Sequence, residues 1–122
     1  MSKPNPIRQI MQDKQLASLG DAFVNFIYSF ALTQVNGRPQ GTKVSDRDLS
    51  EAFRLADLRR YLGTRLSKKD LANASESLLA ETYRTHMLTI EESVQIIACN
   101  PDGPKAGLAD LLRLAVSRLG AK

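Results

Sequence analysis

The sequence predicts an all-α domain of about six helices. Apolar residues recur at three- and four-residue steps through most of the chain, which is the spacing of one helix face. No segment alternates apolar and polar residues over the length of a strand. Because the connections between the periodic segments are short, we expect one domain over residues 1–122, a length sufficient for one hydrophobic core.

The most apolar stretch is LASLGDAFVNFIYSFALT, residues 16–33. We expect a helix enclosed by the rest of the domain, capped by Asp13 and ended near Gly37. Gly20 disfavours a helix interior by about 1 kcal/mol relative to Ala. Asp21 is costly to bury unless a cation, a metal or hydrogen bonds meet its carboxylate. Asp21 is therefore either a functional acid or a residue at an exposed helix edge, solvated or paired with a lysine.

Four further helices are expected, each opened by a residue type that favours helix starts. These residues are Ser45, Ser67, Thr89 and Pro104. Thr89 and Glu92 form the spacing of a capping box. Gly63 is expected to end the helix that begins at Ser45. A short helix over residues 7–12 and a Gly- and Pro-containing loop over 37–44 complete the pattern.

Composition limits the possible functions. Lys and Arg number 17 against 13 Asp and Glu, so the net charge of +4 is compatible with a nucleic-acid partner without requiring one. Cys99 and His86 are the single residues of their types, which excludes an internal disulfide and a zinc cluster. The N-terminus lacks the apolar core of a secretion signal, and Asp21 interrupts the longest apolar run. We therefore expect a cytoplasmic protein without a membrane span.

Basic residues concentrate between positions 54 and 69, where only Asp57 opposes them. They are Arg54, Arg59, Arg60, Arg65, Lys68 and Lys69. This cluster is either a solvated face or an edge that contacts phosphates. Arg38 and Lys43 lie in the 37–44 loop, which is either a plain connector or a second place where a phosphate backbone could approach.

Glu76 and Asn73 lie three residues apart and share one helix face. The alanines on this helix would let a partner helix approach closely. If the partner is the helix that carries Asp21, two carboxylates and an amide oxygen converge, which are hard ligands suited to Mg²⁺. Such an ion can polarise a phosphodiester. The alternative is that Glu76 is a surface residue paired with Lys or Arg.

Two motifs resemble those of the ribonuclease III family. LASLGDAFVNFIYS is similar to the family's signature helix, N-E-R-L-E-F-L-G-D-[AS], and NASESLLAETY is similar to its second element, D-x-x-E-A-L-I-G-A. The resemblance covers residues 13 to about 98. It is strongest to the short archaeal branch that lacks a separate double-stranded-RNA-binding domain. It implies the helical endonuclease-domain fold of that family.

The resemblance also assigns residues. Asp21 and Glu76 match two metal-binding, catalytic acids of the family, and Asn73, a third candidate metal ligand, stands where the family has its second aspartate. Lys14 and Ala17 stand at the two glutamates of N-E-R-L-E. Two of the four usual acids are therefore matched, which should weaken the affinity for Mg²⁺ because the number of ligand charges sets that affinity.

These observations lead to three hypotheses. The first is a Mg²⁺-dependent endoribonuclease, with Mn²⁺ as a substitute ion and no small-molecule cofactor, that cuts double-stranded or structured RNA as a homodimer. Its candidate phosphate contacts are Arg38, Lys43, Arg59, Arg60, Lys68 and Lys69. The second is a catalytically inactive RNA-binding or scaffold protein, which the missing acids at Lys14, Ala17 and Asn73 favour. The third is a helical dimerisation module with no role in RNA binding.

Overall fold

The computed structural model describes residues 6–120, and over that range it contains six α-helices, one 3₁₀ turn and no strand. The elements are α1 (Pro6–Met11), α2 (Lys14–Asn36), α3 (Asp46–Leu55), η1 (Arg59–Tyr61), α4 (Lys68–Arg84), α5 (Ile90–Ala98) and α6 (Pro104–Gly120). The predicted all-α fold with six helices is confirmed.

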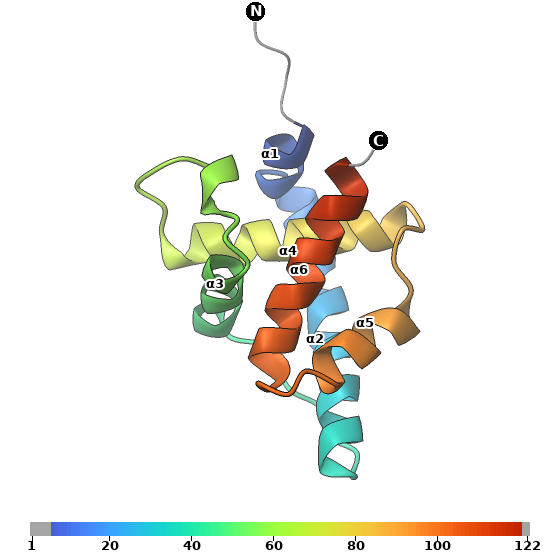
Figure 1. The fold of residues 1–122 in the computed structure, drawn as a ribbon. Coiled ribbons are helices and arrows are strands. Elements are labelled where there is room, and N and C mark those ends of the chain that lie inside the picture. Colours follow the sequence, from blue (N-terminus) through green and yellow to red (C-terminus); the bar gives the residue numbers. More distant parts are fainter. Residues whose placement is uncertain (1–5, 121–122) are drawn as a thin grey trace, which may run out of the picture.

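The central element of the bundle is α4. It crosses between α2 and α6, which both run along the long axis of the molecule (Figure 1). The helix α3 packs against α4 and α6, whereas α5 packs against α2 and α6. Leu71, Leu78 and Leu79 of α4 are completely buried, so the hydrophobic core forms around this helix.

The ends of α2 lie where the sequence predicts them. The Asp13 carboxylate accepts hydrogen bonds from the backbone N–H groups of Gln15 and Leu16, at 2.9 and 3.0 Å, and caps the helix. Gly37 ends it with a φ of 74°, a left-handed conformation that glycine adopts without a steric penalty. Local chemistry therefore fixes this helix independently of the fold around it.

The prediction that α2 is enclosed is wrong. The stripe that contains Gly20, Val24 and Ile27 is buried, but Leu19 and Phe30 on another face are 51% and 52% exposed. The remaining helices of so small a domain cover only part of a 23-residue helix. Within residues 6–120, α2 alone has the length and apolar composition of a membrane span, a test that core helices also pass.

The helix that begins at Ser45 ends at Leu55, eight residues before the predicted end at Gly63. Asp57 adopts a φ of 60°, and a residue in the left-handed region cannot continue a right-handed helix. The chain then turns Leu58 and Leu62 into the core and forms the single 3₁₀ turn of η1 between them. Much of the basic cluster consequently lies on a connecting segment.

Two of the predicted helix starts differ in their capping. At α4, Ser67 and Asp70 bond reciprocally to each other's backbone N–H groups and form a complete capping box. At α5, the Thr89 hydroxyl accepts from the Glu92 N–H, but the Glu92 carboxylate binds Arg118 at 2.6 and 2.7 Å. The side chain of Glu92 therefore joins α5 to α6.

Candidate functional site

Asp21 and Glu76 meet because α2 and α4 cross in very close contact at Gly20. A methyl group on Gly20 would lie 2.8 Å from the Cα atom of Glu76 and closer still to its carbonyl group. Only a residue without a side chain permits this approach, which explains why a helix interior contains a glycine. The crossing brings Asp21, the next residue of α2, to the side chain of Glu76.

The two carboxyl groups lie within hydrogen-bonding reach of each other. Glu76 is only 6% exposed, whereas the Asp21 side chain is 46% exposed. Burial, followed by the hydrogen bond with Asp21 and repulsion from that carboxylate, raises the pKa of Glu76 to about 8. At neutral pH the Glu76 carboxyl group therefore keeps its proton. A divalent cation could replace that proton and neutralise both carboxylates.

Three further polar side chains surround the pair. The Asn25 amide donates to Asp21 Oδ1 at 3.3 Å, and the Lys43 ammonium lies 3.6 Å from the same oxygen. Asp46, at the start of α3, is close enough to raise the pKa of Glu76 as well. Asp21 thus has the lysine partner that the alternative interpretation expected, and it also faces a buried acid. The expected alternative for Glu76, a surface pair with Lys or Arg, is wrong.

Sequence reasoning did not single out Asn25 or Asp46. Asn25 follows Asp21 by four residues, so the shared helix face was a signal available in the sequence. No such signal exists for Asp46, because the packing of α3 against α4 brings it to Glu76.

The positions that depart from the family pattern lie together beside the acid pair. Lys14, Ala17 and Asn73 line one pocket of about 290 Å³. Ala17 and Asn73 are one helical turn from Asp21 and Glu76 respectively. Within residues 6–120, the Asn73 amide makes no hydrogen bond and the Lys14 ammonium makes no ion pair. The departures therefore alter one side of the site and leave the Asp21–Glu76 side intact.

The acid pair has the chemistry of a minimal magnesium site. No three Asp, Glu, His or Cys side chains of the described chain gather closely enough to form a metal cage. Mg²⁺, however, is commonly held by one or two carboxylates together with substrate phosphates and water. Asp21 and Glu76 fit that pattern, because their two convergent carboxyl groups offer an ion two oxygen ligands. Asn73 stays a predicted third ligand.

The predicted phosphate contacts lie at different distances from this pair. Lys69, Asn73 and Glu76 are spaced to share one stripe of α4, so Lys69 lies about 10 Å from Glu76 along the helix axis. Lys68 is the first residue of the same helix, whereas Arg54 belongs to the last turn of α3. Arg38 follows the far end of α2, on the order of 20 Å from Asp21.

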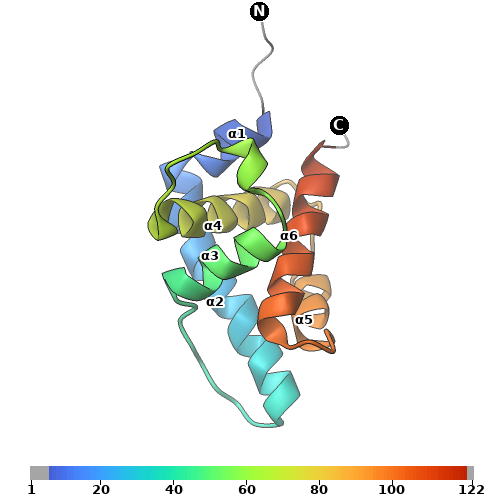
Figure 2. The ribbon, with the colours of Figure 1, turned by 60° about the vertical axis from the view of Figure 1, so that its left-hand side comes forward.

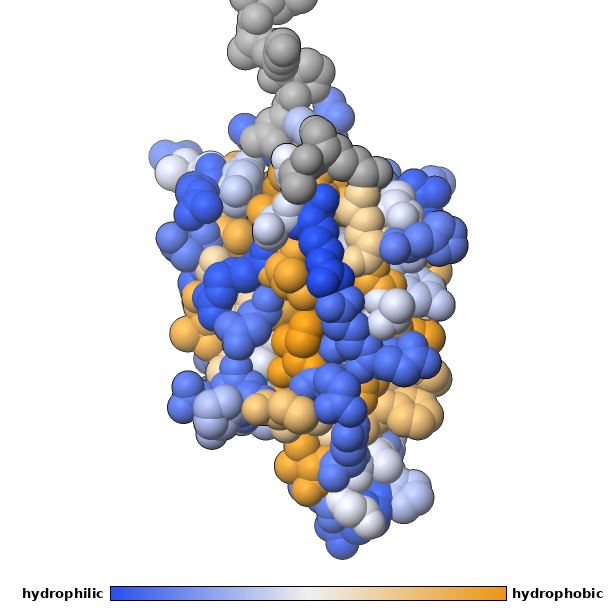
Figure 3. Space-filling model, turned by 45° about the vertical axis from the view of Figure 1, so that its right-hand side comes forward, coloured by the Kyte–Doolittle hydropathy of each residue, from blue (hydrophilic) through white to orange (hydrophobic). Residues whose placement is uncertain are grey.

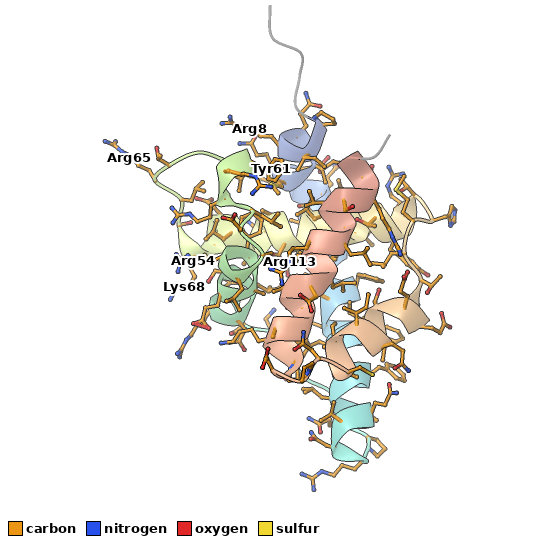
Figure 4. All side chains as sticks on the ribbon, in the orientation of Figure 1. Arg8, Arg54, Tyr61, Arg65, Lys68 and Arg113 are labelled. Atoms are coloured by element: carbon orange, nitrogen blue, oxygen red, sulfur yellow. The ribbon has the colours of Figure 1, made fainter. Side chains whose placement is uncertain are left out.

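Arg59 and Arg60 belong to η1, on the segment between α3 and α4. The Arg60 guanidinium lies over the Tyr61 ring, 5.1 Å from its centre, and 3.2 Å from the Asp57 carboxylate. Arg65 projects outward from the connection that follows (Figure 4). These exposed side chains form a basic margin at the end of the bundle where α4 begins, and we call Arg59, Arg60, Arg65, Lys68 and Lys69 the basic margin below.

Comparison with known proteins agrees with the two motifs and the helical architecture. A family model described as Ribonuclease III matches residues 14–112, a range that includes Asp21, Glu76 and the three departing positions beside them. A search of curated proteins finds no match. Since the family match covers most of the chain and the fold is the helical one that the motifs imply, the protein belongs to the ribonuclease III family.

Proposed function

We propose that this protein is a divalent-metal-dependent endoribonuclease that cuts double-stranded or structured RNA, with residues 1–122 acting as one domain. Membership of the ribonuclease III family suggests RNA endonuclease function. The observation that carries the proposal is the pairing of a buried Glu76 with a half-exposed Asp21 at a helix crossing that requires Gly20. Buried acids held against each other without a cationic partner for both are typical of functional sites.

In this proposal each residue near the pair has a defined task. Asp21 and Glu76 would hold Mg²⁺ or Mn²⁺, which supplies Lewis-acid stabilisation of charge on a phosphodiester. Asn25 orients the Asp21 carboxylate through the hydrogen bond to Oδ1. The basic margin contacts backbone phosphates on one side of the site, as expected for a protein that recognises an RNA duplex through shape and backbone.

The test is cleavage of a long RNA duplex with Mg²⁺ or Mn²⁺. The variants Asp21→Asn and Glu76→Gln should lose cleavage while keeping the fold by circular dichroism. Asp102→Asn is the matched control, because Asp102 is an exposed turn residue remote from the pair in sequence and should keep wild-type activity. Equal cleavage by wild type and Glu76→Gln would exclude catalysis at this site.

We also propose that the protein acts as a homodimer through the exposed apolar stripe of α2. Leu19, Phe23, Phe26 and Phe30 recur at helical spacing, and Tyr83 of α4 stacks on Phe23 with ring centres 4.8 Å apart. Hydrophobic side chains reach the surface between hydrophilic ones in Figure 3. Several exposed apolar side chains along one helix are typical of an interaction surface.

Sedimentation velocity tests the dimer. Phe26→Glu should shift the protein to monomer, because a carboxylate would be buried in an apolar contact. Leu55→Glu changes an equally exposed apolar residue on α3, outside the stripe, and should leave the oligomeric state unchanged. A wild-type monomer at tens of micromolar would refute this part of the proposal.

The second candidate function is RNA binding without cleavage. The pocket formed by Lys14, Ala17 and Asn73 favours it, because all three positions lack the family's acids. Under this alternative, wild type binds duplex RNA with the salt dependence of phosphate contacts but does not cut it. Replacing Lys14 and Asn73 together by Glu and Asp should then create metal-dependent cleavage. Cleavage by wild type would reject the alternative.

A further inference from the structure

The segment between α2 and α3 is held along α2 by a ladder of side chains. Asn25, Ser29 and Thr33 stand four residues apart on one face of α2. Their partners are the backbone groups of every second residue of the segment: Val44, Thr42 and Gln40. Figure 2 shows this segment leaving the end of α2 and running back along the helix towards α3.

Each rung of the ladder consists of one or two hydrogen bonds between an α2 side chain and the backbone of the segment. The Asn25 side-chain oxygen accepts from Val44 N–H at 2.8 Å. The Ser29 hydroxyl accepts from Thr42 N–H at 2.9 Å and donates to Thr42 C=O at 3.2 Å. Thr33 does the same with Gln40, at 3.1 and 3.2 Å. The backbone of the segment is therefore fixed over most of its length, although it contains neither helix nor strand.

The ladder determines where Lys43 lies. Lys43 stands between the two rungs nearest Asp21, and its ammonium group lies 3.6 Å from Asp21 Oδ1. The same oxygen receives the Asn25 amide, so Asn25 connects the last rung to the acid pair directly. The positive charge of Lys43 also lowers the pKa of Glu76, against the larger effects that raise it. Lys43 therefore interacts electrostatically with both acids. A lysine on an unattached loop would spend little time in this position because of the entropy of the chain.

We propose that the ladder-held segment keeps the Lys43 ammonium group beside the Asp21 carboxylate, and that a divalent ion must compete with this ammonium group for the acid pair. This inference rests on the metal site proposed above. Within residues 6–120, Lys43 is the only basic side chain in an ion pair with Asp21 or Glu76. An ion that binds both carboxylates neutralises the charge that attracts Lys43, so the two cations oppose each other.

The expected effect is modest. The Lys43 and Asp21 side chains are 74% and 46% exposed, and exposed ion pairs of this type change an equilibrium by about two- to fivefold. Lys43→Gln should therefore bind Mn²⁺ about two- to fivefold more tightly than wild type. Ser29→Ala removes both bonds to Thr42 without changing any charge, and it should move the affinity in the same direction by a smaller factor.

The experiment measures Mn²⁺ affinity by isothermal titration calorimetry at pH 8 and about 0.1 M salt, with the RNA-free protein. Arg38→Gln is the matched control, because it removes the same charge from the same segment. Arg38 lies on the order of 20 Å from Asp21 along α2, beyond a screening length of about 10 Å, and should leave the affinity unchanged.

Three results would overturn the inference. If Lys43→Gln and Arg38→Gln bind Mn²⁺ equally, or if Lys43→Gln binds it less tightly than wild type, Lys43 is no competitor and the proposed metal site is unaffected. If neither wild type nor Lys43→Gln binds Mn²⁺, the metal site fails and the inference fails with it. Thermal melts of every variant exclude loss of the fold as the cause.

Discussion

Gly20→Ala tests whether the close crossing of α2 and α4 builds the acid pair. The added methyl group would lie 2.8 Å from the Cα atom of Glu76, well inside the ordinary contact distance of 3.4 to 4 Å. The obstacle is backbone, which cannot rotate away. Overpacking of this kind costs about 3 kcal/mol at the upper end of its usual range, and the better helix propensity of Ala returns about 1 kcal/mol. The free energy of unfolding should therefore fall by about 2 kcal/mol.

Thermal and urea unfolding at a fixed protein concentration measure this change. For a domain of this length, a loss of about 2 kcal/mol corresponds to a fall of about 8 °C in Tm. Gly41→Ala is the matched control, because no heavy atom lies within 4 Å of the position that its methyl group would take and its φ is not in the left-handed region. Its free energy of unfolding should stay within about 0.5 kcal/mol of wild type. A Gly20→Ala protein as stable as wild type would refute the reasoning.

Three other predictions follow from the same structure. Between pH 4.5 and about 8 the folded protein binds more protons at Glu76 than the unfolded chain does. The free energy of unfolding should therefore fall with rising pH, by up to about 1.4 kcal/mol per pH unit. Glu76→Gln should remove this slope in urea titrations. Replacing Lys68 and Lys69 by Gln should weaken duplex-RNA binding, measured by fluorescence anisotropy. The slope of log affinity against log salt concentration should fall in magnitude by about one for each lost phosphate contact. An unchanged slope would exclude both lysines from the RNA-binding surface. Asp13→Ala should reduce the free energy of unfolding by about 1 kcal/mol through loss of the α2 cap, and an unaltered Tm would contradict the capping role.

The helix boundaries that depend on neighbouring residues could be predicted from the sequence. Asp13 and Gly37 act on backbone groups a few residues away, so their effect on α2 is local. The end of α3 could not be predicted in this way. Asp57 stops that helix in a left-handed conformation, while the nearest obvious helix-ending residue, Gly63, lies further along the chain. A non-glycine residue with positive φ leaves little trace in the sequence.

The candidate site, like the helix boundaries, could be predicted from the sequence only in part. Gly20 and Asp21 drew attention because a glycine and an acid are out of place on an apolar helix, and Glu76 because it shares a helix face with Asn73 and matches a family acid. Lys43 drew attention only as a possible phosphate contact and Asp46 not at all, because both reach the pair only through the packing of α3 and the ladder on α2. The exposure of Leu19 was likewise missed, because periodicity identifies an apolar face without saying what covers it.

The sequence by itself determined that this chain forms six helices, four of them begun by a capping side chain, and carries two acids of a ribonuclease III motif, since hydrogen-bond caps and residue types act over a few positions. Only the tertiary structure decided that α2 and α4 approach closely enough at Gly20 for Asp21 to raise the pKa of Glu76, and that Lys43 lies against Asp21. The reason is physical: the pKa of a carboxyl group depends on burial and on charges a few ångströms away, and both are set by packing between segments distant in the chain.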